Sequence, residues 1–192
     1  MTGPPSGPSV GRLETKRAPG ALAVGSDGTF AGYAALFGVP DLGRDVILPG
    51  AFRASLARRG AAGIRMLWQH DPGEPVGRWL AVAEDARGLR VRGRLAAGVA
   101  RARELAWLLA EGALDGLSIG FRTVEATRDR ATGLRRLAAI DLWEVSLVTF
   151  PMQPGARIDA PRSPPDDAAV ALAIRAAARR LSTRPSHLTR FP

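Results

Sequence analysis

The chain has 192 residues and a formal net charge of +9, with 46% hydrophobic and 23% charged residues, a composition typical of globular proteins. It contains no apolar run of about 18 residues, so we expect no membrane span. The segment Met1–Pro8 lacks the basic-then-apolar pattern of a signal peptide. Without cysteine there is no disulfide or thiolate metal site, and His70 and His187 are too few for a multi-histidine centre. We therefore expect neither a metal nor a cofactor.

Arginine supplies almost all of the positive charge. An excess of basic residues can indicate nucleic-acid contact. Enrichment in Ala, Arg, Gly and Pro can also reflect a bias in the base composition of the genome. The arginines of the central region are scattered and are not interleaved with aromatic residues: Arg53, Arg58, Arg59, Arg87, Arg90, Arg92, Arg94, Arg101 and Arg103. Nucleic acid is therefore the less favoured partner.

The elements follow from turn signals and hydrophobic periodicity. Residues 1–20 are rich in Pro, Gly and Ser and predict a flexible arm. Period-two patterns and apolar runs predict strands, two of which form a hairpin around Arg87 and Gly88. In chain order, the expected strands are 28–37, 45–48, 64–70, 76–84, 89–95, 117–125 and 134–150.

Helical spacing is present in three segments. Phe52 and Leu56 lie on one face of a helix expected over 51–59. A second helix, over 99–111, carries an apolar stripe of Leu105, Leu108 and Leu109. Beyond a linker rich in Pro and Asp, a third helix is expected over 167–181. Its apolar stripe is thin, so it needs a partner to be stable. We therefore predict a β-rich domain over 21–158, a barrel or strongly curved sheet, followed by a linker, helix and tail over 159–192.

A serine, a histidine and a carboxylate each stand in an apolar, strand-like run, and together they are the parts of an activated nucleophile. Ser118 shares a strand face with Gly120, which would leave room for a substrate backbone beside the hydroxyl. His70 closes a strand-like run just before a turn. His187 lies in a polar tail, which leaves His70 as the candidate base. The alternative for Ser118 is a small polar residue at a tight place in a sheet.

Glu144 is the candidate acid, because a carboxylate among so many apolar residues needs a partner, and a histidine is a natural one. The rival acids are Asp71, the neighbour of His70, and Asp141, expected on the face of Trp143. Ser146 is the rival nucleophile, or else a hydrogen-bonding support for the site. The chain order of histidine, serine and acid differs from that of the commonest serine-hydrolase folds.

Five segments in register resemble the prohead protease family of tailed phages and phage-like particles. They cover the region 28–155 and occur in the expected order: 45–52 (DVILPGAF), 68–71 (WQHD), 75–79 (PVGRW), 116–121 (GLSIGF) and 143–151 (WEVSLVTFP). The resemblance implies a fold similar to the herpesvirus capsid maturation protease, a curved seven-stranded β-barrel with a few surrounding helices.

The resemblance also implies a function. It implies a serine endopeptidase that trims the scaffolding segment of the major capsid protein, and also its own chain, in the cytoplasm inside the immature shell. It places the family histidine at His70 and the nucleophile at Ser118. The herpesvirus relative has a second histidine as the third catalytic residue. The predicted domain over 21–158 contains no second histidine. That role therefore falls to an acid, for which we choose Glu144.

Two other functions are compatible with the sequence. A non-catalytic capsid-assembly component would need only the C-terminal helix and tails. A basic β-barrel nucleic-acid module would need a continuous arginine face with aromatics. The expected partner is the scaffold segment of the major capsid protein. A homo-oligomer is compatible with the sequence, which does not fix the oligomeric state.

Overall fold

The computed structural model describes residues 24–159. The arm expected over 1–20 and the helix expected over 167–181 lie outside this range. Seven strands form one curled sheet: β1 (Thr29–Leu36), β2 (Asp45–Ile47), β3 (Arg65–Trp68), β4 (Asp71–Glu84), β5 (Gly88–Leu95), β6 (Gly116–Arg128) and β7 (Arg135–Val148). Two α-helices accompany them, α1 (Arg53–Arg59) and α2 (Ala100–Ala110). The expected fold class, mainly β with seven strands and few helices, is confirmed.

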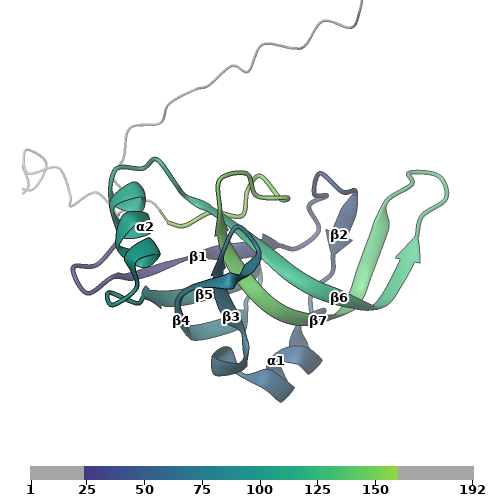
Figure 1. Cartoon of the computed structure of the whole chain (residues 1–192). Helices are drawn as coiled ribbons and strands as arrows, with labels where there is room; N and C mark the ends of the chain where they lie inside the picture. The colour runs from purple at the N-terminus through teal and green to yellow at the C-terminus, as the bar shows by residue number, and fades with distance from the viewer. Residues whose placement is uncertain (1–23, 160–192) are drawn as a thin grey trace, which may run out of the picture.

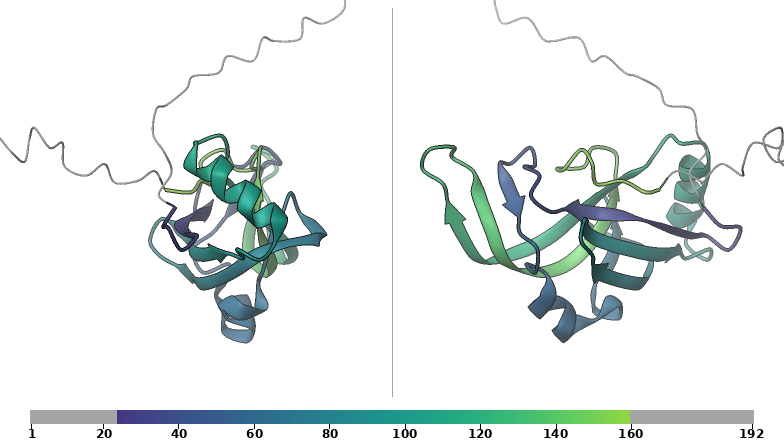
Figure 2. Two further views of the ribbon diagram at one scale, coloured as in Figure 1. Left: turned by 60° about the vertical axis from the view of Figure 1, so that its left-hand side comes forward. Right: turned by 180° about the vertical axis from the view of Figure 1, so that it is seen from behind.

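The strand order is β1-β5-β4-β3-β7-β2, and β6 pairs with the other edge of β7. The β6–β7 pair is long and curls up beside β2, while α2 covers the opposite end of the sheet (Figure 1). Seen from behind, the same curl makes the sheet concave, with α1 below it (Figure 2). β3 and β2 both run parallel to β7, along different parts of its length.

A short segment after β7 joins the two ends of the sheet. Tyr33 of β1 donates its N–H to the carbonyl of Arg157 at 3.0 Å, and Leu117 of β6 donates to the carbonyl of Ala156, also at 3.0 Å. Isolated bridges pair Gly32 with Ile158 and Gly116 with Arg157. Residues 156–158 therefore lie between β1 and β6 and complete the curved wall that carries Ser118.

The buried apolar side chains form one core cluster, drawn mainly from the strands and α2. β7 supplies much of it, because five of its side chains belong to this cluster and are each at most 2% exposed: Leu137, Ile140, Leu142, Val145 and Leu147. Phe52, immediately before α1, is fully buried, as its helical spacing predicted. In α2 the predicted stripe is only partly right. Leu105 and Leu109 are buried, whereas Leu108 is 41% exposed because it lies on the outer flank of the helix.

The connection between β3 and β4 differs from the prediction. The sequence predicts a strand through His70 and a turn over 71–73. Instead Trp68 pairs with Asp71, so the chain reverses through Gln69 and His70 alone. The Pro and Gly of residues 71–73 lie within the first part of β4, where register shifts interrupt the pairing with β3. His70 is therefore a turn residue.

Of the described residues, none belongs to a helix long and apolar enough to cross a membrane.

Candidate active site

His70 is presented on a two-residue turn whose backbone is unusual. Gln69 has φ 51° and His70 has φ 62°, both in the left-handed region that residues other than Gly, Asn and Asp rarely adopt. The end of β7 holds this turn in place. Gln69 donates its N–H to the carbonyl of Leu147 at 3.0 Å and its side-chain amide to the Thr149 hydroxyl at 2.8 Å. His70 donates its N–H to the Ser146 hydroxyl at 3.2 Å.

The His70 ring is oriented by Glu144. The Oε1 atom of Glu144 lies 2.6 Å from His70 Nδ1, and the carboxylate is almost entirely buried. Ser146 donates its hydroxyl to the other carboxylate oxygen, Oε2, at 2.6 Å. A hydrogen on Nδ1 satisfies Glu144 and leaves Nε2 as the acceptor. The hydrogen bond that His70 donates to the Glu144 carboxylate raises the pKa of His70 above 6.5, and partial burial of the ring opposes that rise.

The pairing of β6 with β7 brings Ser118 to the same face. Ser118 stands opposite Ser146, and Gly120 stands opposite Glu144. Directly paired residues of antiparallel strands have Cβ atoms about 4.5–5.5 Å apart on one face of the sheet. One face of the β6–β7 pair therefore carries Ser118, Gly120, Glu144 and Ser146. His70, on the turn before β4, contacts Glu144 and Ser146 on this face.

Gly120 has a different role from the one expected. The sequence suggested open space for a substrate backbone beside the Ser118 hydroxyl. A Cβ atom at Gly120 would lie 2.0 Å from Oε1 of Glu144 and 2.7 Å from its Cδ. The space is thus filled by the carboxylate of Glu144, which reaches across Gly120 toward His70. Only glycine at this position leaves that path open.

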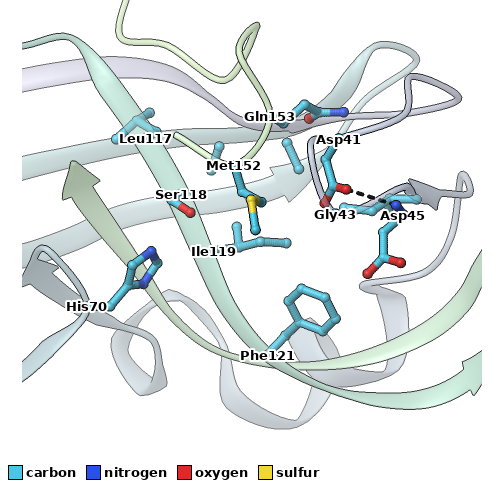
Figure 3. Close-up of a pocket in the computed structure, with 13 residues that line it drawn as sticks. Asp41, Gly43, Asp45, His70, Leu117, Ser118, Ile119, Phe121, Met152 and Gln153 are labelled. Carbon is cyan, nitrogen blue, oxygen red and sulfur yellow. Dashed lines mark hydrogen bonds between the residues drawn. The ribbon is translucent and has the colours of Figure 1, made fainter. Parts of the chain in front are cut away.

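Ser118 and His70 open onto one cavity of about 260 Å³ (Figure 3). Ser118 comes from β6 and His70 from the turn, and both border the same space. The Ser118 side chain is largely buried and has no hydrogen-bond partner among the described residues. Hydrogen bonds between nucleophile and base are often long without substrate and tighten when substrate binds. The arrangement provides an unengaged hydroxyl, an oriented imidazole and a buried carboxylate.

The two rival acids are engaged elsewhere. Asp141 is buried and binds Arg58 at 2.8 Å, Arg59 at 3.0 Å and the indole N–H of Trp143 at 2.9 Å. The two arginines and the indole hold the pKa of Asp141 well below its usual range. Asp71 is exposed and accepts the N–H of Gly73 at 2.7 Å. Of the three acids, Glu144 is the one that contacts the His70 ring.

An irregularity in β7 separates Glu144 from Asp141. The register shifts between Gly120 and Phe121, so Phe121 pairs with Leu142 and Trp143 is left as an extra residue. Strict alternation along the strand would place Leu142 on the face of Glu144, but Leu142 shares a face with Phe121 instead. Strict alternation would also place Trp143 with Val145 and Leu147, which are fully buried, whereas Trp143 is 53% exposed.

Sequence reasoning missed how much of the turn is held from β7. The roles of Gln69 and Thr149 have no sequence signal, because both are ordinary polar residues near a strand end. Ser146 did carry a signal, since it shares a strand face with Glu144. Within residues 24–159, no three His, Asp or Glu side chains gather closely enough to hold a metal ion.

Two kinds of comparison place the chain among known proteins. The family model described as caudovirus prohead serine protease matches residues 15–167. The prohead protease of Enterobacteria phage HK97 is 38% identical over 141 residues, which cover 72% of this chain and 62% of that protein. The chain thus matches less than two thirds of the length of this relative.

Solved structures give a more distant likeness. The protease of Kaposi's sarcoma herpesvirus, in complex with a hexapeptide phosphonate inhibitor, has a TM-score of 0.45 and 14% identity, covering 84% of this chain and 79% of that one. Varicella-zoster virus protease has a TM-score of 0.43 and 21% identity, covering 80% and 74%. Similarity this distant has no bearing on the site. The family match is different, because it covers most of the chain. The chain belongs to the caudovirus prohead serine protease family.

Proposed function

We propose that this chain is a serine endopeptidase that cleaves the scaffolding segment of the major capsid protein, and also its own chain, inside the immature shell. The observation that carries the proposal is the His70–Glu144 contact of 2.6 Å beside Ser118 on a shared cavity. Family membership supports the reaction class. The capsid precursor is the substrate that the name of the phage HK97 relative suggests.

In the proposed mechanism, Ser118 is the nucleophile and His70 the base. Nε2 of His70 takes the hydroxyl proton as Oγ of Ser118 bonds to the carbonyl carbon of the peptide. The resulting imidazolium gives that proton to the leaving amine as the C–N bond breaks, which leaves an acyl ester on Ser118. Water then attacks the ester, giving a proton to His70. His70 returns that proton to Oγ of Ser118 as the acyl C–O bond breaks, which releases the carboxylate product and restores the hydroxyl.

Glu144 fits the role of the acid in this cycle. Its carboxylate holds the Nδ1 hydrogen and stabilises the positive charge that the ring gains during each half-reaction. Because Ser146 satisfies the second carboxylate oxygen, Glu144 is not left with an unpaired buried oxygen. The buried charge is therefore fixed in position before the substrate arrives.

The test is cleavage of purified capsid precursor by the full chain and by Ser118→Ala, followed by gel electrophoresis and mass spectrometry of the products. We expect the wild type to cleave and the variant to be inactive, with an unchanged melting temperature because only a hydroxyl is lost. Ser146→Ala, run in parallel, should retain measurable cleavage. Full activity of Ser118→Ala would overturn the assignment of the nucleophile.

A further inference from the structure

The cavity beside Ser118 and His70 is apolar along most of its wall and acidic on the side away from His70. The cleavage mechanism does not use this difference. Its walls are mostly apolar and come from β1, β2, β6 and the segment after β7: Ala34, Ala35, Ile47, Leu117, Ile119, Phe121 and Met152. Asp41 and Asp45 line it on the side away from His70, with Ile119 and Met152 between (Figure 3). A side chain entering beside Ser118 would therefore pass apolar walls before it reached the acids.

The depth of the cavity beside β1 depends on small residues. The register of β1 with β5 shifts between Tyr33 and Ala35, which leaves Ala34 as an extra residue. Ala34 and Ala35 are both buried, and both line the cavity. Two consecutive methyl side chains on one wall leave room for an unbranched aliphatic stem.

The two acids differ in how well their charge is neutralised. Asp45 accepts from the guanidinium of Arg135, whose Nε lies 2.7 Å from Oδ1 and whose Nη2 bonds Oδ2. Asp41 accepts the backbone N–H of Asp45 at 2.8 Å. Among residues 24–159, no arginine or lysine nitrogen lies within 4.0 Å of its carboxylate. This side of the cavity therefore has two carboxylates and one guanidinium, with Asp41 unpaired.

Partial burial makes that unpaired charge costly. Burial and the nearby Asp45 raise the pKa of Asp41, while Arg135 and the backbone hydrogen bonds oppose the rise. A cation brought next to Asp41 would offset this cost. A purely apolar side chain would cover the carboxylate and leave it without a partner.

Building on the proposed proteolytic function, we propose that the cavity receives a lysine or arginine side chain flanking the cleaved bond, and that Asp41 is its specificity-determining residue. The aliphatic stem lies against the apolar walls. The charged end reaches Asp41. Substrates with a basic residue beside the cleaved bond are then preferred over those with an apolar residue of equal length.

The experiment compares matched peptides around the bond that mass spectrometry identifies in the capsid precursor. Each of the two flanking positions is varied in turn among lysine, norleucine and glutamate. Norleucine keeps the stem of lysine and lacks its charge. At one of the two positions, we expect the wild type to prefer lysine over norleucine by about tenfold or more in kcat/KM, equivalent to about 1.4 kcal/mol.

Asp41→Asn should remove most of this preference by lowering cleavage of the lysine peptide, while the norleucine peptide is cleaved at least as well as by the wild type, which also shows that the variant is folded. Asp41→Lys should favour the glutamate peptide. Glu125→Gln, an exposed acid on β6 that does not line the cavity, should keep the wild-type preference.

Equal cleavage of lysine and norleucine peptides by the wild type would overturn the specificity assignment alone, as would a preference that survives in Asp41→Asn. Absence of cleavage of every peptide and of the precursor would instead overturn the proposed function, and this inference with it.

Discussion

Ser118 and Ser146 stand directly opposite each other on β6 and β7, but their hydroxyls are in different situations. Ser146 is fully buried, donates to Glu144 at 2.6 Å and accepts the N–H of His70 at 3.2 Å. Ser118 opens onto the cavity and has no partner among the described residues. A hydroxyl committed to two hydrogen bonds positions its neighbours, whereas an unengaged one beside an imidazole can attack a carbonyl.

Ser146→Ala should therefore slow cleavage without abolishing it. The substitution leaves Oε2 of Glu144 and the N–H of His70 without their partner, a cost of about 1–3 kcal/mol per buried group. We expect a lower kcat, with KM nearly unchanged, and a lower melting temperature. Ser146→Thr keeps the hydroxyl and should recover part of the rate. Complete loss of activity in Ser146→Ala, combined with full activity in Ser118→Ala, would make Ser146 the nucleophile instead.

The pH dependence of cleavage should report the state of His70. The base must be neutral, so kcat/KM should rise with pH through the His70 pKa, which the hydrogen bond to the Glu144 carboxylate raises above 6.5. Glu144→Gln should move this limb to lower pH and reduce the plateau by about 10²–10⁴-fold. Asp71→Asn, which removes an exposed acid beside His70, should leave the limb in place. A pH profile unchanged in Glu144→Gln would contradict the role of Glu144.

The same pair has a predictable effect on stability. A histidine whose pKa is raised on folding adds stability that is fully present below pH 6.5 and is lost as the pH rises through the folded-state pKa. Glu144→Gln should therefore lower the melting temperature more at about pH 5.5 than at about pH 9. Thermal unfolding at the two pH values measures this difference.

The strands could be predicted because their apolar patterns are long, and β1, β5, β6 and β7 lie within a few residues of their expected positions. The turn at Gln69 and His70 could not be predicted, because two consecutive residues other than glycine rarely both adopt the left-handed region. Its conformation depends on acceptors from β7, which are distant in sequence. The segment 156–158 was missed for a similar reason, because it pairs through isolated bridges and has no strand pattern of its own.

The candidate site, too, has features that could be predicted from the sequence and features that could not. Glu144 could be selected because a carboxylate in an apolar run needs a partner. The extra residue at Trp143 could not be foreseen, since the register shift depends on how β6 meets β7. The role of Gly120 depends on the same pairing, because the side chain that passes over it belongs to the opposite strand. Asp41 belongs to a loop, where periodicity says nothing about which way a side chain points.

Gly120→Ala tests that role. The added methyl would meet Oε1 of Glu144 at 2.0 Å, so the carboxylate must move away from its place beside His70. We expect a loss of kcat approaching that of Glu144→Gln, with a destabilisation of about 1–3 kcal/mol from overpacking. Gly98→Ala is the matched control, because nothing lies within 4 Å of the added methyl. Wild-type activity in Gly120→Ala would show that Glu144 need not lie across this position.

Asp141→Asn should affect stability rather than catalysis. The Asp141 carboxylate forms ion pairs with Arg58 and Arg59 and accepts a hydrogen bond from the Trp143 indole. It does not contact the His70 ring. Because its pKa is depressed on folding, its contribution is present above pH 3.8 and is lost as the pH falls toward the folded-state value. The variant should melt at a lower temperature near neutral pH and show a smaller fall in stability on acidification. A change in the pH limb of kcat/KM would instead make Asp141 part of the catalytic group.

Truncation after Ala160 should separate catalysis from delivery to the shell. The expected linker over 159–167 contains a proline-rich break at 161–165, and every candidate catalytic residue lies before it. The described body ends with residues 156–159, which bond to β1 and β6, and Asp159 accepts from Arg90 at 2.9 Å. We therefore expect the truncated chain to cleave a short peptide within about twofold of the full chain and to process assembled precursor shells poorly, because a lost tether lowers the effective concentration.

Truncation after Gly155 is the matched control for this experiment. It also removes the carbonyls of Ala156 and Arg157, which accept from Leu117 and Tyr33, so the wall that carries Ser118 loses its link to β1. This shorter chain should lose peptide cleavage and melt at a lower temperature. If truncation after Ala160 impaired both substrates equally, the tail would support the fold. If it impaired neither, the tail would have no part in delivering the enzyme to its substrate.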